Sequence, residues 1–458
     1  NININQLKYK PQDNAVKSIH RIALQNFDDI TNVEELAKMV YGNSNLKNLQ
    51  NISNDLIRYQ QVLLGFKDIK GLKVPTGEIF DDILSSFPPE NEYGQFASGA
   101  IRNAKLEIRD KLLKTKGTKL VQLRNNVLKL IDSDPSVILM TETTSNLRLP
   151  NSINSIDSLI APMEKGDTSF FEILKPEILL TLGGMVISKK IKKFLRKFSP
   201  KEHWHVDPYR ANNTYYCLSQ HFSMSINNFF PKFFGEYSIT KSDYKPRTLN
   251  QYQFQLHLGN TYLAQIPFSD LKAYETIFER LPKNIHLQLA NSSTIRYAQL
   301  FQMPVHAEIF CNRGTSGIDG STATAVGASL INQNQTLLLT GDLSFFYDIN
   351  GLWNNYIPSN FRIIIINNQG GGIFRILPGE KDSPKYDTYF ETIHRRNAKQ
   401  LAIAHGFTYK AVKTNSGLRW ALKTFFKPSS KPKILEVKTP RRINDSILLN
   451  YFKAMQKS

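Results

Sequence analysis

The chain has 458 residues, enough for two or three domains, and 41% of them are hydrophobic, enough to form buried cores. Its only cysteines are Cys217 and Cys311, which excludes a disulfide framework and a cysteine metal site. No run of 18 apolar residues occurs, and the first residues, NININQLKYKPQ, lack the apolar segment of a signal peptide. We therefore expect a soluble, cytoplasmic protein without a membrane span.

The net charge of +19 raises the question of nucleic-acid binding, since basic surfaces bind phosphate backbones. The lysines, however, are scattered and accompanied by many Asn and Ile residues, so we expect no nucleic-acid partner. The densest basic run, SKKIKKFLRKFSPK (188–201), predicts one helix with Ile191, Phe194 and Leu195 on its apolar side. A solvated helix face is the favoured interpretation, and a site for an anion or a partner is the alternative.

Residues 1–117 form a polar segment with helix-like spacing and turn signals at Pro75, Pro88 and Pro89. This segment contains no glycine-rich phosphate loop, no metal-ligand spacing and no series of strands. We assign it as a helix-rich N-terminal segment without a legible function.

Residues 118–232 are expected to form a central α/β domain with a Rossmann-like order of elements. VILMTET (137–143) and ILLTLGG (178–184) read as buried parallel strands, and HWHVDP (203–208) reads as a further strand end. The sequence GGMVISKK lacks the glycine spacing of a dinucleotide fingerprint. For His203 and His205, a packed or hydrogen-bonded pair is favoured over a metal site, which would need a third ligand.

Residues 233–458 are assigned to a second α/β domain, in which EYSITKSDYKPRTLNQYQ (236–253) resembles a linker or an excursion. The strands predicted after it are IHLQLANS, AEIFCNRG, TLLLTGD, FRIIIINNQ and KILEVKTP. Their alternation with helical segments predicts a doubly wound parallel sheet.

Polar and glycine-rich loops follow four of these strands, and such loops face the ligand crevice of an open α/β sheet. Asp342 and Asn368 each lie at the carboxyl end of a strand, the latter before three glycines. Together with bare glycine carbonyls they predict an all-oxygen site for Mg²⁺ and a diphosphate. The other two loops are 290–296, with Ser292 and Arg296, and 312–327, with Arg313 and glycines at 314, 317 and 320.

The segments CNRGTSGIDGSTATAVG, TGDLSFFYD, INNQGGGIFRILPG, TETTSN, NSIDSLI, LLTLGGMVISKKI and HWHVDP resemble the MenD family. Members of that family are thiamine-diphosphate-dependent synthases of menaquinone biosynthesis. The resemblance covers about residues 118–458. Leu343, where most thiamine enzymes have a second glycine, matches this group.

The resemblance implies two cofactors, thiamine diphosphate and Mg²⁺, with Mn²⁺ as an alternative ion. It assigns the metal to Asp342, Asn368 and the carbonyl of Gly370. The cofactor contacts that it implies are Ser316, Ile318, Gly341, Asp342, Asn368, Gly370 and Ile373, with Ile318 as the apolar wedge that bends the cofactor. The substrate contacts that it implies are Ser292, Arg296, Arg313 and Phe374. The implied reaction, a transferase reaction, decarboxylates 2-oxoglutarate and adds the resulting carbanion to isochorismate.

The resemblance also implies a pyrimidine-binding domain with an activating glutamate, which we do not find in residues 1–117. Glu92, in ENEYGQFASGAIRNA (90–104), is a weak candidate for that catalytic residue. The alternatives are therefore a catalytically impaired cofactor-binding remnant fused to an N-terminal binding module, or half of a split enzyme that needs a separate pyrimidine domain. The family further implies a homodimer or a tetramer.

Overall fold

The computed structural model describes residues 122–456 except 165–168, 185, 314 and 377–384. The chain divides into two compact units, Asn1–Leu123 and Arg124–Ser458, and the described residues lie almost entirely in the second. The segment 1–117 and Glu92 are outside the described residues.

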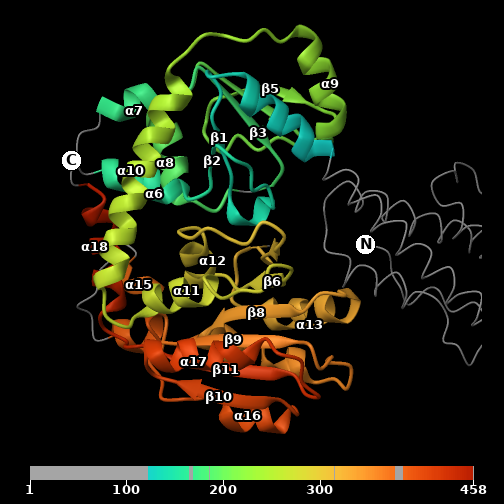
Figure 1. Ribbon diagram of the computed structural model, residues 1–458, viewed down its shortest axis with the longest axis vertical. Coiled ribbons are helices and arrows are strands. Elements are labelled where there is room, and N and C mark those ends of the chain that lie inside the picture. The colour runs from blue at the N-terminus through green and yellow to red at the C-terminus, as the bar shows by residue number, and fades with distance from the viewer. Residues whose placement is uncertain (1–121, 165–168, 185, 314, 377–384, 457–458) are drawn as a thin grey trace, which may run out of the picture. The chain divides into compact units, whose positions relative to one another are not determined.

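The second unit is built from parallel sheets and helices (Figure 1). Its strands are β1 (Leu139–Met140), β2 (Ser152–Ile153), β3 (Ile178–Leu182), β4 (Glu202–Val206), β5 (Leu218–Phe222), β6 (His286–Leu289), β7 (Glu308–Phe310), β8 (Thr336–Gly341), β9 (Arg362–Asn367), β10 (Thr408–Val412) and β11 (Lys433–Lys438). Its helices are α6 (Ile156–Ile160), α7 (Ser169–Leu174), α8 (Lys189–Lys197), α9 (Ile226–Glu236), α10 (Tyr244–Gln265), α11 (Asp270–Phe278), α12 (Ser293–Ala298), α13 (Ser321–Ile331), α14 (Asp342–Tyr347), α15 (Ile373–Ile376), α16 (Lys399–Ala404), α17 (Asn415–Phe425) and α18 (Asn444–Ala454). Short turns of helix are η3 (Thr143–Ser145), η4 (Ala161–Glu164), η5 (Ile349–Leu352) and η6 (Tyr386–Phe390).

The C-terminal sheet has six parallel strands in the order β10-β11-β9-β8-β6-β7. Its central strands are buried on both faces, which explains their unbroken apolar runs. In β9, Ile364 and Ile366 pack into the core with α11, α12, α17 and α18, whereas Ile363 and Ile365 pack into the core with α13, α14 and α16. The α/β fold with a doubly wound parallel sheet is thereby confirmed.

The strand order reverses direction next to β6. The chain passes from β6 to β7 on one side and then returns to β8 on the other side of β6. Open α/β sheets bind their ligands in the crevice at such a switch point, outside the carboxyl ends of the strands. The topology therefore directs attention to the loops after β6, β8 and β9.

The central part of the chain contains the three-stranded parallel sheet β3-β4-β5 and the short pair β1-β2. Strands were predicted at 137–143, 178–184 and 203–208, and the observed β1, β3 and β4 overlap these ranges. The prediction of buried strands at 137–143 and 178–184 is wrong in one respect, because β1 and β3 are only partly buried and Ile178 is 50% exposed.

Helix α10 corrects the expected linker at 236–253. Residues from Tyr244 onwards are helical, and Tyr252 belongs to the central core while Leu263 belongs to the C-terminal core. Figure 1 shows α10 as one long helix that contacts α6 and α18. It therefore joins the two cores instead of linking them loosely. Among the described helices, none has the length and apolar character that crossing a membrane would require.

Candidate functional site

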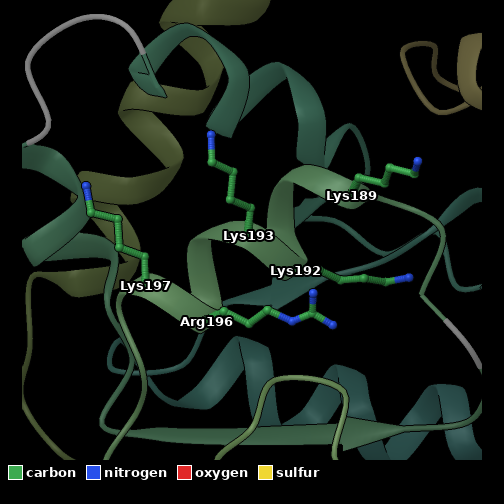
Figure 2. Close-up of a pocket in the computed structure, with 5 residues that line it drawn as sticks. All are labelled: Lys189, Lys192, Lys193, Arg196 and Lys197. Carbon is green, nitrogen blue, oxygen red and sulfur yellow. The ribbon is translucent and has the colours of Figure 1, made fainter. Parts of the chain in front are cut away.

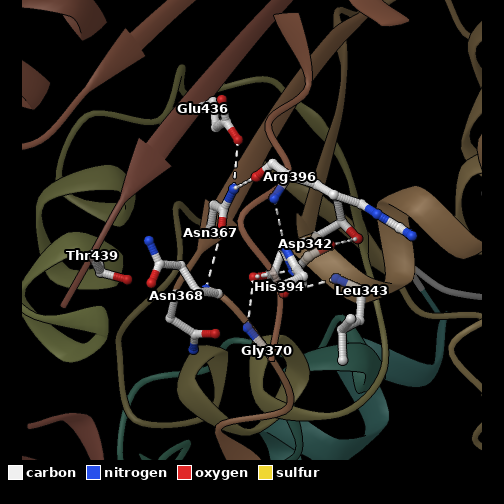
Figure 3. A network of polar contacts seen from close by, with 12 residues as sticks. Asp342, Leu343, Asn367, Asn368, Gly370, His394, Arg396, Glu436 and Thr439 are labelled. Atoms are coloured by element: carbon white, nitrogen blue, oxygen red, sulfur yellow. Dashed lines mark hydrogen bonds and ion pairs between the residues drawn. The ribbon is translucent and has the colours of Figure 1, made fainter. Parts of the chain in front are cut away.

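Asp342 connects the loops that follow β8 and β9. It is the first residue of α14, directly after β8, and is only 3% exposed. Its Oδ1 accepts a hydrogen bond from the Leu343 backbone nitrogen at 2.7 Å, and its Oδ2 accepts one from the Gly370 nitrogen at 3.1 Å (Figure 3). The two strand-end loops that were predicted to converge do so through this carboxylate.

Asn368 follows β9 directly and is held from one side. Its Nδ2 donates to Oδ2 of the buried Asp270 at 2.7 Å, which leaves its amide oxygen on the opposite side of the group. Among the described residues, no donor to that oxygen is found. Gly370 has φ +153°, a backbone conformation that favours glycine.

The donor atoms of this site fit a hard divalent cation. A carboxylate, an amide oxygen and a backbone carbonyl are the oxygen ligands that Mg²⁺ accepts. No group of three or more His, Cys, Asp or Glu side chains suited to a metal occurs in the described part of the chain.

Two residues at this site were not predicted from the sequence. His394 Nε2 lies 3.2 Å from Oδ2 of Asp342, and the His394 backbone nitrogen donates to the Gln369 carbonyl. Asp270 accepts a hydrogen bond from the Asn368 side chain. Burial raises the pKa of Asp270 to about 6, although the hydrogen bonds from Thr439 and Asn368 act in the opposite direction. Neither residue belongs to a strand-end motif, so the sequence pattern gave no signal for them.

Asn291, another residue that was not singled out, organises the loop that precedes α13. Its Nδ2 donates to the carbonyls of Asn312 and Gly317 at 2.6 and 2.7 Å, and its Oδ1 accepts from Arg313 Nη1 at 2.8 Å. Since Asn291 follows β6 after a single residue, this amide fixes the second loop against the switch point. Its place in ANSSTIR at a strand end is a signal that could have identified it.

Cationic side chains from three segments gather near this loop. Arg296 on α12 is largely buried, and its Nε has no hydrogen-bond partner in the described structure. Burial lowers the pKa of Arg296 most, and the positive charge of Arg313 lowers it further. Lys192 on α8 also has a pKa lowered mainly by burial, with Arg313 contributing in the same direction and Glu142 opposing. The predicted residues Arg296 and Arg313 are thus close enough to repel each other, and Lys192 joins them. Such a cluster favours an anionic ligand.

Helix α8 has the predicted form. Its buried residues are Ile191, Phe194 and Leu195, as expected from the basic run at 188–201. Its other faces line a shallow cavity of about 640 Å³ (Figure 2), whose lining residues are Lys189, Lys192, Lys193, Arg196 and Lys197.

The start of α8 is fixed by Glu142, from the loop after β1. Its carboxylate accepts hydrogen bonds from the backbone nitrogens of Ile187 and Ser188 at 2.7 to 2.8 Å. Burial raises the pKa of Glu142 to about 7, with these hydrogen bonds opposing and Asp157 adding a like charge. The Ser188 hydroxyl hydrogen-bonds to the Asp157 carboxylate.

The remaining predicted residues surround the same crevice edge of the sheet. Ser316 is exposed and has φ +67°, and its backbone nitrogen donates to the Arg313 carbonyl. The Ile318 carbonyl accepts from the hydroxyl of Ser344, on α14, at 2.7 Å. Ser292 has φ +68° and precedes α12, and Gly341 is the last residue of β8. Ile373 is buried, and Gly314 is outside the described residues.

Phe374 is 36% exposed and stacks edge-on against Phe390 at 5.9 Å between ring centroids.

His203 and His205, for which a packed or hydrogen-bonded pair was predicted, are hydrogen-bonded to the same threonine. Both rings contact Oγ1 of Thr181, through His203 Nε2 and His205 Nδ1, each at 2.8 Å. Burial lowers the pKa of His203 to about 4, so this ring is neutral at neutral pH. The pair bridges β3 and β4 within the central sheet.

Comparison with known proteins agrees with the geometry. Residues 291–437 match the family described as "Thiamine pyrophosphate enzyme, C-terminal TPP binding domain". The chain is 50% identical over 327 residues to a 2-succinyl-5-enolpyruvyl-6-hydroxy-3-cyclohexene-1-carboxylate synthase from Flavobacterium psychrophilum. This match covers 71% of the chain and 59% of the relative. The matched part is similar to thiamine pyrophosphate enzymes of the MenD group.

Two further MenD synthases show the same similarity. The protein from Christiangramia forsetii is 51% identical over 72% of this chain and 57% of its own length. The protein from Flavobacterium johnsoniae is 49% identical over 72% of this chain and 59% of its own length. The chain thus spans less than two thirds of the relatives that it matches. The matched family model describes a domain that binds thiamine pyrophosphate.

Proposed function

We propose that this chain provides the diphosphate-binding and central parts of a MenD synthase. In this proposal it decarboxylates 2-oxoglutarate and adds the resulting succinyl-semialdehyde unit to isochorismate, as the resemblance to the MenD family implies. The observation that carries the proposal is the convergence of Asp342, Asn368 and Gly370 at the ends of β8 and β9, beside the switch point of the sheet. Asp342, the Asn368 amide oxygen and the Gly370 carbonyl would hold Mg²⁺.

The cationic cluster supports anionic substrates. Arg296 and Arg313 would bind carboxylates of 2-oxoglutarate and isochorismate, because a guanidinium can form two parallel hydrogen bonds with a carboxylate. Lys192, from α8, would add a third positive charge on the same side. Ser292 precedes α12 at the same strand end and would contact the substrate through its hydroxyl.

The remaining proposed contacts would position the cofactor and exclude water. Ile318 would support the bent cofactor, with Ser316 and Gly341 near its diphosphate. Ile373 and Phe374 would line the reacting carbon with apolar surface. These roles follow from the resemblance, and the location of each residue at the crevice edge of the sheet is consistent with them.

Exposed apolar side chains near Gly370 support an oligomer. Tyr389 is 74% exposed, Phe390 54% and Ile393 40%. Large apolar side chains gathered in this way are typical of surfaces that bind another chain. We propose that they contact a second subunit in a homodimer or tetramer, which light scattering after gel filtration would test.

The function is tested with purified chain, Mg²⁺, thiamine diphosphate, 2-oxoglutarate and isochorismate, with CO₂ release and adduct formation measured. Cofactor binding is measured separately by calorimetry. We expect Mg²⁺-dependent cofactor binding that Asp342→Ala abolishes. An absence of cofactor binding would refute the metal site, whereas binding without turnover would refute only the proposed reaction of this chain.

A further inference from the structure

The orientation of the Asn368 amide is set by one contact. An asparagine can ligate a hard cation only through its oxygen, because its nitrogen carries two protons and no lone pair for a metal. In the structure, Asn368 Nδ2 donates to Asp270 Oδ2 at 2.7 Å, and both residues are buried. If the Asn368 amide flipped, this hydrogen bond would be lost, and the amide oxygen would face the carboxylate oxygen of Asp270.

Asp270 is itself held in place from two other segments. Its Oδ1 accepts a hydrogen bond from Thr439 Oγ1 at 2.5 Å, and its backbone nitrogen donates to Asn444 Oδ1 at 2.8 Å. Thr439 lies just after β11, and Asp270 is the first residue of α11. An ionised carboxylate only accepts hydrogen bonds, so both Thr439 and Asn368 must present donors to it.

We infer that Asp270 is a positioning residue that orients the Asn368 amide so that its oxygen faces the divalent metal. This inference rests on the proposed function, which assigns Asn368 to the metal. Asp270 contacts neither metal nor substrate in this role. It acts as an outer partner of a ligand, a position at which substitutions typically weaken metal affinity about 10- to 100-fold.

The isosteric substitution Asp270→Asn separates orientation from packing. The new side chain keeps its shape and can still accept from Thr439 through its oxygen. With that oxygen on Thr439, its NH₂ group faces Asn368, and the Asn368 amide flips and turns its own nitrogen towards the metal. The opposite rotamer of the new amide would leave the Thr439 proton without its acceptor. Metal affinity should fall although the fold is retained.

The exchanged pair Asp270→Asn with Asn368→Asp restores the pattern of donors and acceptors. The amide nitrogen introduced on α11 donates to one oxygen of the carboxylate introduced after β9, and the other oxygen of that carboxylate remains available to the metal. Asn368→Asp alone places two carboxylates against each other and should weaken binding or the fold. The double variant is therefore expected to bind the metal better than either single variant.

The experiment measures Mn²⁺ bound in the presence of thiamine diphosphate, from the loss of the free-ion signal in electron paramagnetic resonance, together with the melting temperature. We expect Asp270→Asn to weaken Mn²⁺ binding by at least about 10-fold, and the double variant to recover to within about 3-fold of the unchanged chain. The matched control is Thr276→Val, which removes a hydrogen bond from the same helix to Asn415 and should leave Mn²⁺ binding unchanged.

Each outcome decides between the inference and the proposed function. If the unchanged chain does not retain Mn²⁺ with thiamine diphosphate, the metal site fails, and the role of Asp270 fails with it. If the unchanged chain binds and Asp270→Asn binds equally well, only the role of Asp270 is overturned. If Asp270→Asn does not fold, the double variant decides, because a folded double variant with weak Mn²⁺ binding also overturns the inference.

Discussion

Asn146 and Ile309 form two hydrogen bonds with each other, although they lie 163 positions apart in the sequence. Asn146 Nδ2 donates to the Ile309 carbonyl at 2.9 Å, and the Ile309 nitrogen donates to Asn146 Oδ1 at 2.8 Å. Ile309 lies in β7, at the edge of the six-stranded sheet, and Asn146 follows η3 with φ +56°. The asparagine thus continues the hydrogen bonding of an edge strand.

Asn146→Ala should lower the free energy of unfolding by about 2–4 kcal/mol. It leaves two backbone groups of Ile309 without partners, and it places a side chain with Cβ in a left-handed conformation. Asn146→Gly, measured in parallel by urea unfolding, loses the same hydrogen bonds without the backbone strain and should cost about 1 kcal/mol less. Equal stability of both variants and the unchanged chain would show that the contact contributes nothing.

Glu142 should make stability depend on pH. Its ordinary pKa of 4.5 is raised to about 7 in the folded protein, mainly by burial. Between these values the folded state binds a proton that the unfolded state does not, so stability is greatest below the lower value and falls as the pH rises to about 7. The decrease should amount to about 3 kcal/mol.

The matched variant for this prediction is Glu142→Gln, which keeps an acceptor for the Ser188 nitrogen but does not titrate. Asp270, whose raised pKa acts in the same direction, is present in both proteins and cancels in the comparison. Urea unfolding at several values between pH 4.5 and 8 gives the difference. Parallel curves for the two proteins would contradict the prediction.

The sequence predicts the central strands well because they are buried on both faces. Four consecutive isoleucines in β9 can only be accommodated between two layers of helices. The strands β5 (LSQHF) and β10 (TYKAV) were not predicted, since each lies at a sheet edge and mixes polar with apolar residues. Periodicity carries little information at such positions.

Helix α10 was misjudged for a related reason. Its buried positions include Thr248, Gln255 and Gly259, so polar and small residues occupy the face that packs. A methyl group on Gly259 would lie 3.1 Å from the Tyr451 ring and hydroxyl, so a small residue permits the close approach of α18. Its composition therefore resembles that of a linker although it packs against two cores.

The sequence predicts those site residues that directly follow a strand. Asp342 and Asn368 each follow a recognisable strand, and the topology brings them together. Asp270 precedes Asn368 by 98 positions and begins an ordinary helix, so nothing local connects the two. Contacts that depend on the tertiary packing of separate segments have no signature in a single sequence.

Gly370→Ala should disrupt the loop that follows β9. A Cβ at this position would lie 2.5 Å from the Glu391 carbonyl oxygen, and φ is +153°. We expect a loss of about 2–4 kcal/mol in unfolding free energy, together with weaker Mg²⁺-dependent cofactor binding, because the backbone must move. Thermal unfolding and calorimetry measure the two effects.

Gly341→Ala is the control for this substitution. A Cβ at Gly341 meets no atom within 4 Å, and this glycine lies at the other strand end of the same site. The unfolding free energy of the Gly341→Ala variant should stay within about 1 kcal/mol of that of the unchanged chain. If both alanine variants were equally stable, the close approach of Glu391 to Gly370 would be irrelevant to the fold.

Arg296 should reduce stability in the absence of substrate and increase it when a dicarboxylate is bound. Its buried Nε has no partner within the described residues, and Arg313 repels its charge, so removing the guanidinium relieves two unfavourable contributions. Arg296→Met should therefore raise the stability of the unliganded chain by about 1 kcal/mol. The same variant should lose most of the increase in melting temperature that 2-oxoglutarate produces in the presence of Mg²⁺ and thiamine diphosphate.

Arg280→Met, at a partly exposed arginine paired with Glu279, should change neither quantity. A variant Arg296→Met that is less stable without ligand, yet responds fully to 2-oxoglutarate, would assign this arginine to the fold instead of to substrate binding.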